Sequence, residues 1–481
     1  MGEISRRDWL KGAAAAWVVA ESGWGARAAM ALDLPNARPA RADRHFTSAA
    51  IEALIPKIQR KIADRALATI FENCYPNTLD TTVFPGVFEG KPDTYVVTGD
   101  IDAMWLRDSS AQVWPYLAPA KEDANLRTLI EGVIRRQARM ILIDPYANAF
   151  VRDDKAAPLS WAVDDKTEHH AGVGERKWEV DSLCYTLRLA HGYWQATGDT
   201  RPFDATWKEA AWTIVRTFRA QQRKDGPGPY SFERASAIPY DTVPLSGFGN
   251  PARPVGMIFS MFRPSDDACI YPLFVPANLF AVTCLRHLAE LAGQVLGDAK
   301  LAVEAGALAA EVERALAQWG RTRHAQLGEI WAYEVDGYGN ALMMDDANAP
   351  GLVSLSYLGC CKREDPLFQR TRQFALSKAN PYFFAGKAAD GVGGPHEGLN
   401  MVWPMGILYR ALSSGDEGEM RQCLRWLRDT TAGTGFIHES FDKDNASHFT
   451  RPWFAWANTL FGELVLKLAN ERPGLLGASL G

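Results

Sequence analysis

The chain has 481 residues, 47% of them apolar and 11% aromatic, which is enough for one very large domain or for two or three ordinary ones. Its net charge of −5 comes without a long basic run, so a nucleic-acid partner is not expected. The seven cysteines form no C-x-x-C pair, which argues against a zinc cluster and a disulfide scaffold, although the odd count with one free thiol still allows a disulfide.

Residues 1–31 resemble a twin-arginine export signal. Ser5-Arg6-Arg7 opens it, the apolar stretch Gly12–Ala20 follows, and Ala29-Met30-Ala31 fits a cleavage site. The alternative is an ordinary amphipathic first helix. No later segment reaches the ~18 unbroken apolar residues of a membrane helix. We therefore expect a soluble periplasmic or secreted protein, exported in the folded state and not bound to a membrane.

Apolar residues recur at helical spacing from Phe46 onward, and convincing strands are few, which predicts an all-α fold. The best strand candidates, 93–98, 149–152 and 329–335, are expected to form local hairpins in loops. Paired helices of this kind can close into a toroid in a single domain, although the periodicity also allows an open solenoid. We expect about twelve helices, over 47–70, 108–118, 122–142, 178–197, 203–222, 274–296, 298–320, 351–361, 366–378, 399–413, 416–430 and 454–470.

The first chemically informative motif is Trp105-Leu106-Arg107-Asp108, at the start of a predicted helix. Asp108 could cap that helix. Capping does not explain why Trp, Arg and Asp occur together. Arg107 and Asp108 could grip neighbouring hydroxyls of one sugar while Trp105 covers its apolar face. The motif favours a sugar site.

Two further motifs place carboxylates at helix starts. Asp181, in Lys177-Trp178-Glu179-Val180-Asp181-Ser182, is either a first-turn residue favoured by the helix dipole or a substrate contact. In Arg263-Pro264-Ser265-Asp266-Asp267 the adjacent carboxylates must point in different directions, so one can bind helix amides while the other faces a pocket. A carboxyl group with apolar neighbours can stay protonated and act as a general acid. The motif does not choose between Asp266 and Asp267.

The last motifs pair a histidine with a glutamate. His396-Glu397 follows Gly393-Gly394-Pro395, a loop that lets the backbone approach a ligand, and the flat face of Trp403 comes shortly after it. His438-Glu439 lies among glycines and aromatic residues. It is either a surface ion pair or a pocket wall in which Glu439 deprotonates a water molecule.

No metal motif is complete in this sequence. The second His of H-E-x-x-H is replaced by Asn400, the third acid of D-D-x-x-D is missing after Asp266-Asp267, and Asp345-Asp346 lacks the Gly and Glu of a calcium loop. We expect no cofactor and no metal.

Taken in order, these blocks resemble glycoside hydrolase family 125, the exo-acting α-1,6-mannosidases of bacteria and fungi, from about Pro56 to Leu466. The resemblance implies one (α/α)6 catalytic domain over residues 32–481 and metal-independent release of terminal α-1,6-linked mannose from glycans with inversion. It places the general acid in the Asp266-Asp267 pair, with Asp266 preferred, and makes Glu439 the general base. The implied sugar contacts are Trp105, Arg107, Asp108, Glu397 and His438, and Asp181, Arg263 and His396 are further candidates.

Rival functions stay open at this stage. Another (α/α)6 enzyme, such as a glucoamylase-like or trehalase-like hydrolase or a polysaccharide lyase, would share the fold. A non-catalytic periplasmic glycan-binding protein would share the sugar contacts. The partner that we expect is an α-mannoside oligosaccharide, and the expected oligomeric state is a monomer. The loops 144–176 and 224–249 match no motif, so the leaving-group preference is not predicted.

Overall fold

A computed structural model describes residues 34–480, so the predicted export signal lies outside the described residues. Their secondary structure is mainly helical. The α-helices are α2 (Ala49–Gln59), α3 (Arg65–Cys74), α4 (Leu106–Val113), α5 (Leu117–Ala120), α6 (Ala124–Ile143), α7 (Val180–Thr197), α8 (Ala205–Ala220), α9 (Val275–Gln294), α10 (Ala299–Trp319), α11 (Pro366–Ala375), α12 (Pro404–Leu412), α13 (Glu417–Asp429), α14 (Ala455–Glu471) and α15 (Pro473–Leu476).

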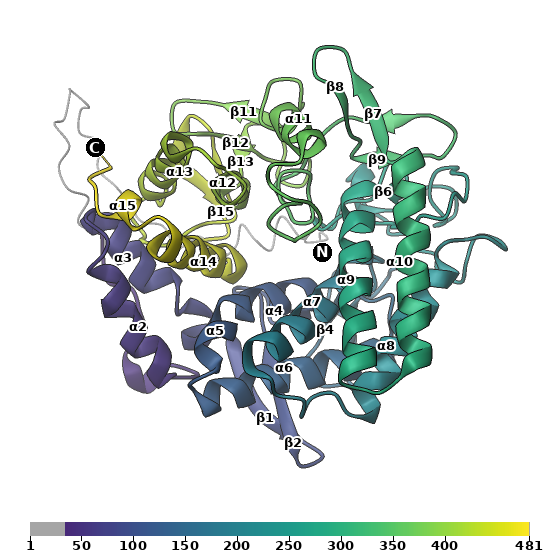
Figure 1. The fold of residues 1–481 in the computed structure, drawn as a ribbon, viewed down its shortest axis with the longest axis horizontal. Helices are drawn as coiled ribbons and strands as arrows, with labels where there is room; N and C mark the ends of the chain where they lie inside the picture. The colour runs from purple at the N-terminus through teal and green to yellow at the C-terminus, as the bar shows by residue number, and fades with distance from the viewer. Residues whose placement is uncertain (1–33, 481) are drawn as a thin grey trace, which may run out of the picture.

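The helices lie around the centre of the molecule, and the chain returns to its starting point (Figure 1). The first helices, α2 and α3, lie beside the last ones, α14 and α15, and α14 packs against both α3 and α4. The long helices α9 and α10 form a tightly packed pair, and α9 also packs against α7. Segments from both ends of the sequence therefore meet.

Asp side chains begin many of the helices, because each accepts a hydrogen bond from a first-turn amide that has no helical partner. Asp298 accepts from the amide of Leu301 and Asp416 from that of Glu419. Gly198, with φ of 68°, ends α7 in the left-handed conformation that glycine adopts without strain. The same capping role belongs to Asp64, Asp123, Asp204 and Asp365.

The largest errors among the predicted helices lie at 47–70 and 351–361. The segment 47–70 is two helices, because α2 ends at Gln59 and Asp64 caps α3. The segment 351–361 forms irregular turns in place of a helix. Its backbone hydrogen bonds do not keep the regular helical separation of four residues. Ser354 donates to Gly351, three residues earlier, and Cys360 donates to Leu355, five residues earlier. The Ser354 hydroxyl also bonds to the backbone of Gly351, an alternative to helical pairing.

Strands are short throughout the described residues. The predicted strand 93–98 is β2 (Lys91–Val96), which forms a hairpin with the unpredicted β1 (Val83–Phe88). The segment 329–335 divides into β8 (Gly328–Trp331), paired with β7 (Arg321–His324), and β9 (Glu334–Val335). The remaining strands are β3 (Met104–Trp105), β4 (Ala149–Phe150), β5 (Val173–Glu175), β6 (Leu273–Phe274), β10 (Ala341–Leu342), β11 (Phe383–Ala385), β12 (Asp390–Val392), β13 (Met401–Val402), β14 (Ser440–Asp442) and β15 (Asn445–Thr450).

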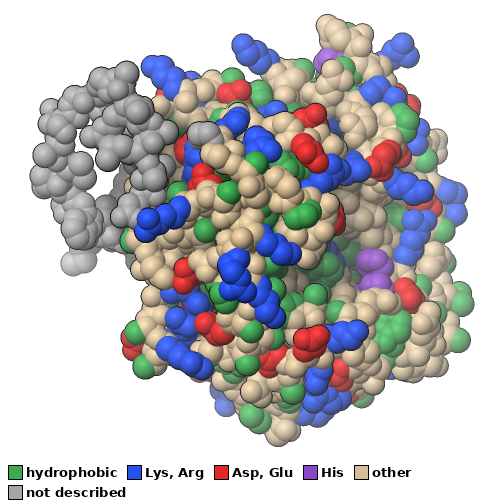
Figure 2. All heavy atoms as spheres, turned by 60° about the vertical axis from the view of Figure 1, so that its left-hand side comes forward, with side chains coloured by type: hydrophobic (Ala, Val, Ile, Leu, Met, Phe, Trp, Pro, Cys, Tyr) green, Lys and Arg blue, Asp and Glu red, His purple; other side chains and the backbone are tan. Residues whose placement is uncertain are grey.

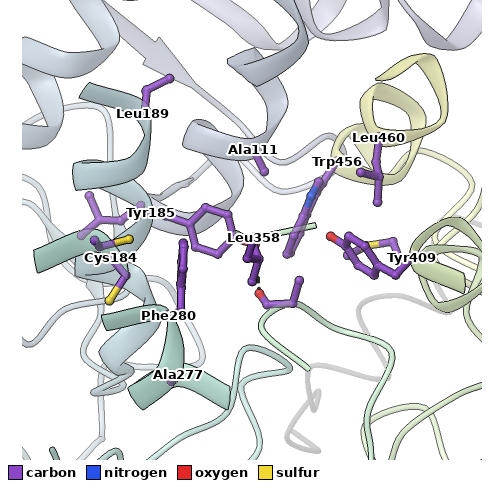
Figure 3. Close-up of a cluster of buried hydrophobic side chains, with 14 of the residues drawn as sticks. Ala111, Cys184, Tyr185, Leu189, Ala277, Phe280, Leu358, Tyr409, Trp456 and Leu460 are labelled. Atoms are coloured by element: carbon purple, nitrogen blue, oxygen red, sulfur yellow. Dashed lines mark hydrogen bonds between the residues drawn. The ribbon is translucent and has the colours of Figure 1, made fainter. Parts of the chain in front are cut away.

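One hydrophobic cluster extends through the described residues from Leu34 to Leu480. At its centre Tyr185 of α7 lies between Phe280 of α9 and Trp456 of α14 (Figure 3), with edge-to-face ring separations of 5.1 and 6.0 Å. All seven cysteines are free thiols, so no disulfide is formed. Among the described residues, no helix is both long and apolar enough to cross a bilayer. Acidic and basic side chains are interspersed over the face seen in Figure 2.

Candidate active site

A single pocket gathers chemically important side chains from five separate parts of the chain. Its empty space, which includes the solvent at its open mouth, is about 390 Å³. The predicted residues that line it are Trp105, Arg107, Asp108, Asp266, His396 and Glu439.

The pocket wall joins the early and late parts of the chain. Gly99 forms a β-bridge with Phe454, and a side chain at Gly99 would lie 2.2 Å from the carbonyl oxygen of Trp453. Gly99 also has φ of 129°, so two independent constraints require glycine there. Arg451 Nη2 donates to Asp100 Oδ1 over 2.6 Å. These contacts hold the Trp105 motif against the segment that follows Glu439.

Glu439 directly precedes β14, the central strand of the sheet β13-β14-β15. The Thr450 hydroxyl donates to Glu439 Oε2 over 3.1 Å, and Arg451 Nη1 donates to Oε1 over 3.2 Å. Burial alone would lower the pKa of Arg451, but Glu439 and Asp100 raise it, so Arg451 stays charged. Glu439 is 4% exposed, and these two donors fix the direction of its carboxylate.

Asp266 and Asp267 have opposite surroundings, as adjacent residues in a turn must. Asp266 has φ of 65°, the left-handed region that Asp tolerates better than most residues, and it lines the pocket. Asp267 is 1% exposed and does not line the pocket. It accepts hydrogen bonds from Ser265 Oγ over 3.1 Å and, when His396 Nδ1 carries a proton, from that nitrogen over 3.0 Å.

Arg107 binds several carboxylates at the base of the pocket. Its Nη1 donates to Glu179 over 2.5 Å and to Asp181 over 3.2 Å, and its Nη2 donates to Asp266 Oδ1 over 3.4 Å. Burial raises the pKa of Asp108 to about 6 and that of Asp181 to about 6, against the opposing effect of Arg107. One guanidinium therefore faces more carboxyl groups than its charge can balance.

Asp181 and Arg263 do not line the pocket and have structural partners. Asp181 is fully buried and bound to Arg107, so it supports a pocket residue from behind. Arg263 Nε donates over 2.6 Å to Glu334, which also accepts the amides of Ile270 and Tyr271. Arg263 thus anchors the loop that carries Asp266.

His438 and Glu397 are not among the lining residues either. The His438 ring stacks on Phe449 at 3.8 Å between centroids, and its Nε2 bonds to the carbonyl of Thr431 over 3.1 Å. Burial lowers the pKa of His438 to about 4, which keeps the ring neutral behind Glu439. Glu397 is half-buried beside His396.

Several lining residues had no predicted role. Arg451, Phe454 and Trp456 come from the cluster Arg451-Pro452-Trp453-Phe454-Ala455-Trp456, whose density of aromatic residues beside an arginine was the available signal. Asn348 follows Asp346, whose Oδ1 accepts from both its amide and its side chain. Trp403, predicted to offer a flat face, does line the pocket.

Three polar atoms of the pocket lining are buried without a hydrogen-bond partner, and the site has no arrangement suited to a metal. These atoms are Trp403 Nε1, Asp108 Oδ2 and Arg107 Nε, of which the last two lie 3.6 Å apart in an ion pair. Buried polar groups are rarely left unpaired, so these atoms indicate a polar ligand. Across residues 34–480, no three His, Cys, Asp or Glu side chains are grouped in a way that could hold a metal ion.

Comparison with known proteins identifies the family. The sequence profile described as "Metal-independent alpha-mannosidase (GH125)" matches residues 64–466. The chain is 42% identical over 462 residues to the meiotically up-regulated gene 157 protein of Schizosaccharomyces pombe, covering 92% of this chain and 90% of the relative. A metal-independent α-mannosidase from Streptococcus pneumoniae, solved in a non-productive complex with α-1,6-mannobiose, superposes with a TM-score of 0.84 at 39% identity, covering 89% of this chain and all of that one. The chain therefore belongs to glycoside hydrolase family 125 and is an α-mannosidase.

Proposed function

We propose that this α-mannosidase is exo-acting and inverting and that it releases terminal α-1,6-linked mannose from glycans. The observation that carries the proposal is the presence of Asp266 and Glu439 in one pocket, although 173 positions separate them (439 − 266). The α-1,6 preference draws support from the mannobiose bound by the Streptococcus pneumoniae enzyme. No feature favours the lyase or the non-catalytic binding protein.

In this mechanism Asp266 protonates the departing glycosidic oxygen while Glu439 takes a proton from the attacking water. The C1–O bond breaks as the water oxygen bonds to C1 on the opposite face of the ring. Inversion needs the two carboxyl groups roughly 6.5–9.5 Å apart, to leave space for that water. The scheme gives the acid role to Asp266 in preference to Asp267, and the position of Asp267 outside the pocket lining supports that choice.

The terminal mannose is recognised by the other lining residues. Asp108 Oδ2 would accept a hydrogen bond from one of its hydroxyls, and Trp403 Nε1 would donate one to another. Both buried atoms would then have a partner. Trp105 would cover an apolar face of the ring. His396, whose Nδ1 bonds to Asp267, lines the same pocket and would contact the sugar.

The ring of helices leads us to propose the (α/α)6 barrel as the architecture, in one domain. Residues 1–31 are proposed to direct twin-arginine export to the periplasm or the medium. The working form is proposed to be a monomer. Size-exclusion chromatography with light scattering and cell fractionation test these two proposals.

Proton NMR of the first sugar released from α-1,6-mannobiose tests the reaction. We expect the β-anomer of mannose to appear first and to mutarotate later. An initial α-anomer would show retention and contradict the scheme, and an ultraviolet-absorbing product would indicate a lyase. Absence of any product would favour a binding protein.

The two catalytic assignments are tested by near-isosteric variants. Asp266→Asn and Glu439→Gln should each lower kcat at least ~100-fold, because general acid and base catalysis each contribute about 10²–10⁴. Circular dichroism should show unchanged folding. Near-normal turnover in either variant would overturn that residue's role.

A further inference from the structure

The carboxyl group of Glu179 lies against the proposed acid but takes no part in the scheme above. Glu179 is fully buried at the start of α7. Its Oε2 accepts from Arg107 Nη1 over 2.5 Å and from Ser182 Oγ over 2.8 Å. Its Oε1 is also buried and receives no N–H or O–H donor from the described residues. A buried oxygen of this kind needs a proton of its own.

Asp266 has the complementary arrangement. Its Oδ1 accepts from Arg107 Nη2 over 3.4 Å and from Asn148 Nδ2 over 3.3 Å. Lys177 Nζ donates instead to the backbone carbonyl of Asp266 over 2.8 Å. Glu179 and Asp266 therefore accept hydrogen bonds from the two different terminal nitrogens of Arg107. A side-chain hydrogen bond with Asp266 adds to burial and to the charges of Asp266 and Asp181 in raising the pKa of Glu179, against the opposing effect of Arg107.

We propose that Glu179 is a positioning residue that shares one proton with Asp266, an inference that rests on the proposed acid role of Asp266. The shared proton lies between Glu179 Oε1 and Asp266 Oδ2, since Oε2 and Oδ1 already accept two donors each. Without substrate, Glu179 retains the proton. When substrate binds, the proton shifts from Glu179 Oε1 to Asp266 Oδ2, which leaves Glu179 ionised, and Oδ2 then donates it to the glycosidic oxygen.

The charges balance in this step. The reactive form has a protonated Asp266 and an ionised Glu179, whose charge Arg107 Nη1 stabilises at 2.5 Å. Bond breaking leaves both carboxyls ionised, and Asp266, which faces the pocket, takes its next proton from water. The ionised Glu179 makes Asp266 hold its proton more tightly, as in any close carboxyl pair. The other charged groups around the pair are Asp108, Glu175, Lys177, Asp181, Asp241, Glu439 and Arg451.

Glu179→Gln tests the proposal with Asp181→Asn as its matched control. Both residues are fully buried and accept from Arg107 Nη1, but Asp181 affects the pair only through its charge. The glutamine amide in the Glu179→Gln variant donates permanently to Asp266 and carries no charge, so the alkaline limb of kcat/KM against pH should move down by at least about one pH unit. In Asp181→Asn we expect less than half of that displacement.

Two further readouts separate proton sharing from a structural role. Activity of Glu179→Gln should recover towards wild type on aryl mannosides whose leaving group needs no acid. Its infrared spectrum at neutral pH should lack one carboxylic-acid C=O band that wild type and Asp181→Asn retain. An unmoved alkaline limb, or loss on both substrates alike, would overturn the proposal.

The result is interpretable even if a variant fails. If Glu179→Gln does not fold, the pH profile of Asp181→Asn still tests the proposal. A displacement of its alkaline limb by about one pH unit or more would show that charge alone acts on Asp266. An unmoved alkaline limb in Asp181→Asn would support proton sharing. If Asp266→Asn keeps normal turnover, the acid assignment itself is wrong. If Asp266→Asn is inactive and Glu179→Gln is unchanged, only the sharing is wrong.

Discussion

At the residue scale, the two adjacent aspartates show how orientation separates chemistry from support. The left-handed backbone of Asp266 directs its own carboxyl group into the pocket. The carboxyl group of Asp267 stays bonded to Ser265 and His396. Sequence identifies the pair as an acid candidate, but a choice between the two needs this backbone conformation. The same limit applies to Asp181 and His438, which have suitable chemistry and do not line the pocket.

Asp267→Asn should therefore behave differently from Asp266→Asn. An asparagine keeps one oxygen that can accept from His396 Nδ1, and its amide can donate to the Ser265 hydroxyl in place of the second acceptor. We therefore expect more than ~10% of wild-type kcat, with KM raised several-fold through a loosened His396. Loss of acid catalysis, in contrast, costs ~100-fold or more in kcat. Steady-state kinetics on α-1,6-mannobiose measures both. Equal losses of kcat in the two variants would contradict the assignment.

His438 should make stability depend on pH. Burial lowers its pKa from 6.5 to about 4, so the unfolded chain binds more protons between these values. Its stabilising contribution is complete above pH 6.5 and is lost as pH falls towards 4. His438→Gln lacks this titration, so wild type should lose at most about 3 kcal/mol relative to the variant over that range. Urea unfolding at several pH values measures it, and a constant difference would contradict the prediction.

At the element scale, the segment 34–38 supports the loop that carries Glu439. Asn73 of α3, 1% exposed, donates to the carbonyls of Pro35 and Gly435 over 3.0 and 3.1 Å and accepts from the Ala37 amide over 2.9 Å. Arg38 binds Asp80 through two hydrogen bonds and fixes the end of the segment. The start of the described chain thus contributes indirectly to the site.

Asn73→Ala should lower both stability and turnover. It removes the amide donor from the buried carbonyl of Gly435, at about 1–3 kcal/mol for a buried group, and from the more exposed carbonyl of Pro35, which water can reach. Thermal unfolding and kcat should both decrease, because the loop ahead of Glu439 loses its fixed position. Asn36→Ala is the control, since Asn36 makes an exposed side-chain bond to Glu72. Equal effects of the two variants would show that the segment does not support the loop.

Helix boundaries were predictable where local chemistry sets them. The glycine-aspartate links before α10 and α13 are examples, and Asp64 was a readable signal for the missed break between α2 and α3. The turns at 351–361 were not predictable in this way. The amides of Leu352 and Val353 bond there to the buried carboxylate of Asp345, a contact set by packing around the site.

At the scale of the whole molecule, the pocket depends on closure of the chain upon itself. Asp100 and Arg451 are 351 positions apart and joined by hydrogen bonds of 2.6 and 2.9 Å. Helix α14 packs on α3 and α4, and one hydrophobic cluster reaches from Leu34 to Leu480. Local sequence patterns predict the helices, but closure follows only from these long-range contacts.

This closure predicts that activity and structure are lost together. In urea, helix content, tryptophan fluorescence and residual activity should show the same midpoint, because opening either end exposes the shared core and separates Glu439 from Asp266. In Asn73→Ala all three midpoints should fall together. Two resolved steps in circular dichroism would instead indicate independent domains. Earlier loss of activity alone would show that the Asp100–Arg451 contact opens before the core, and that the site is less stable than the fold that holds it.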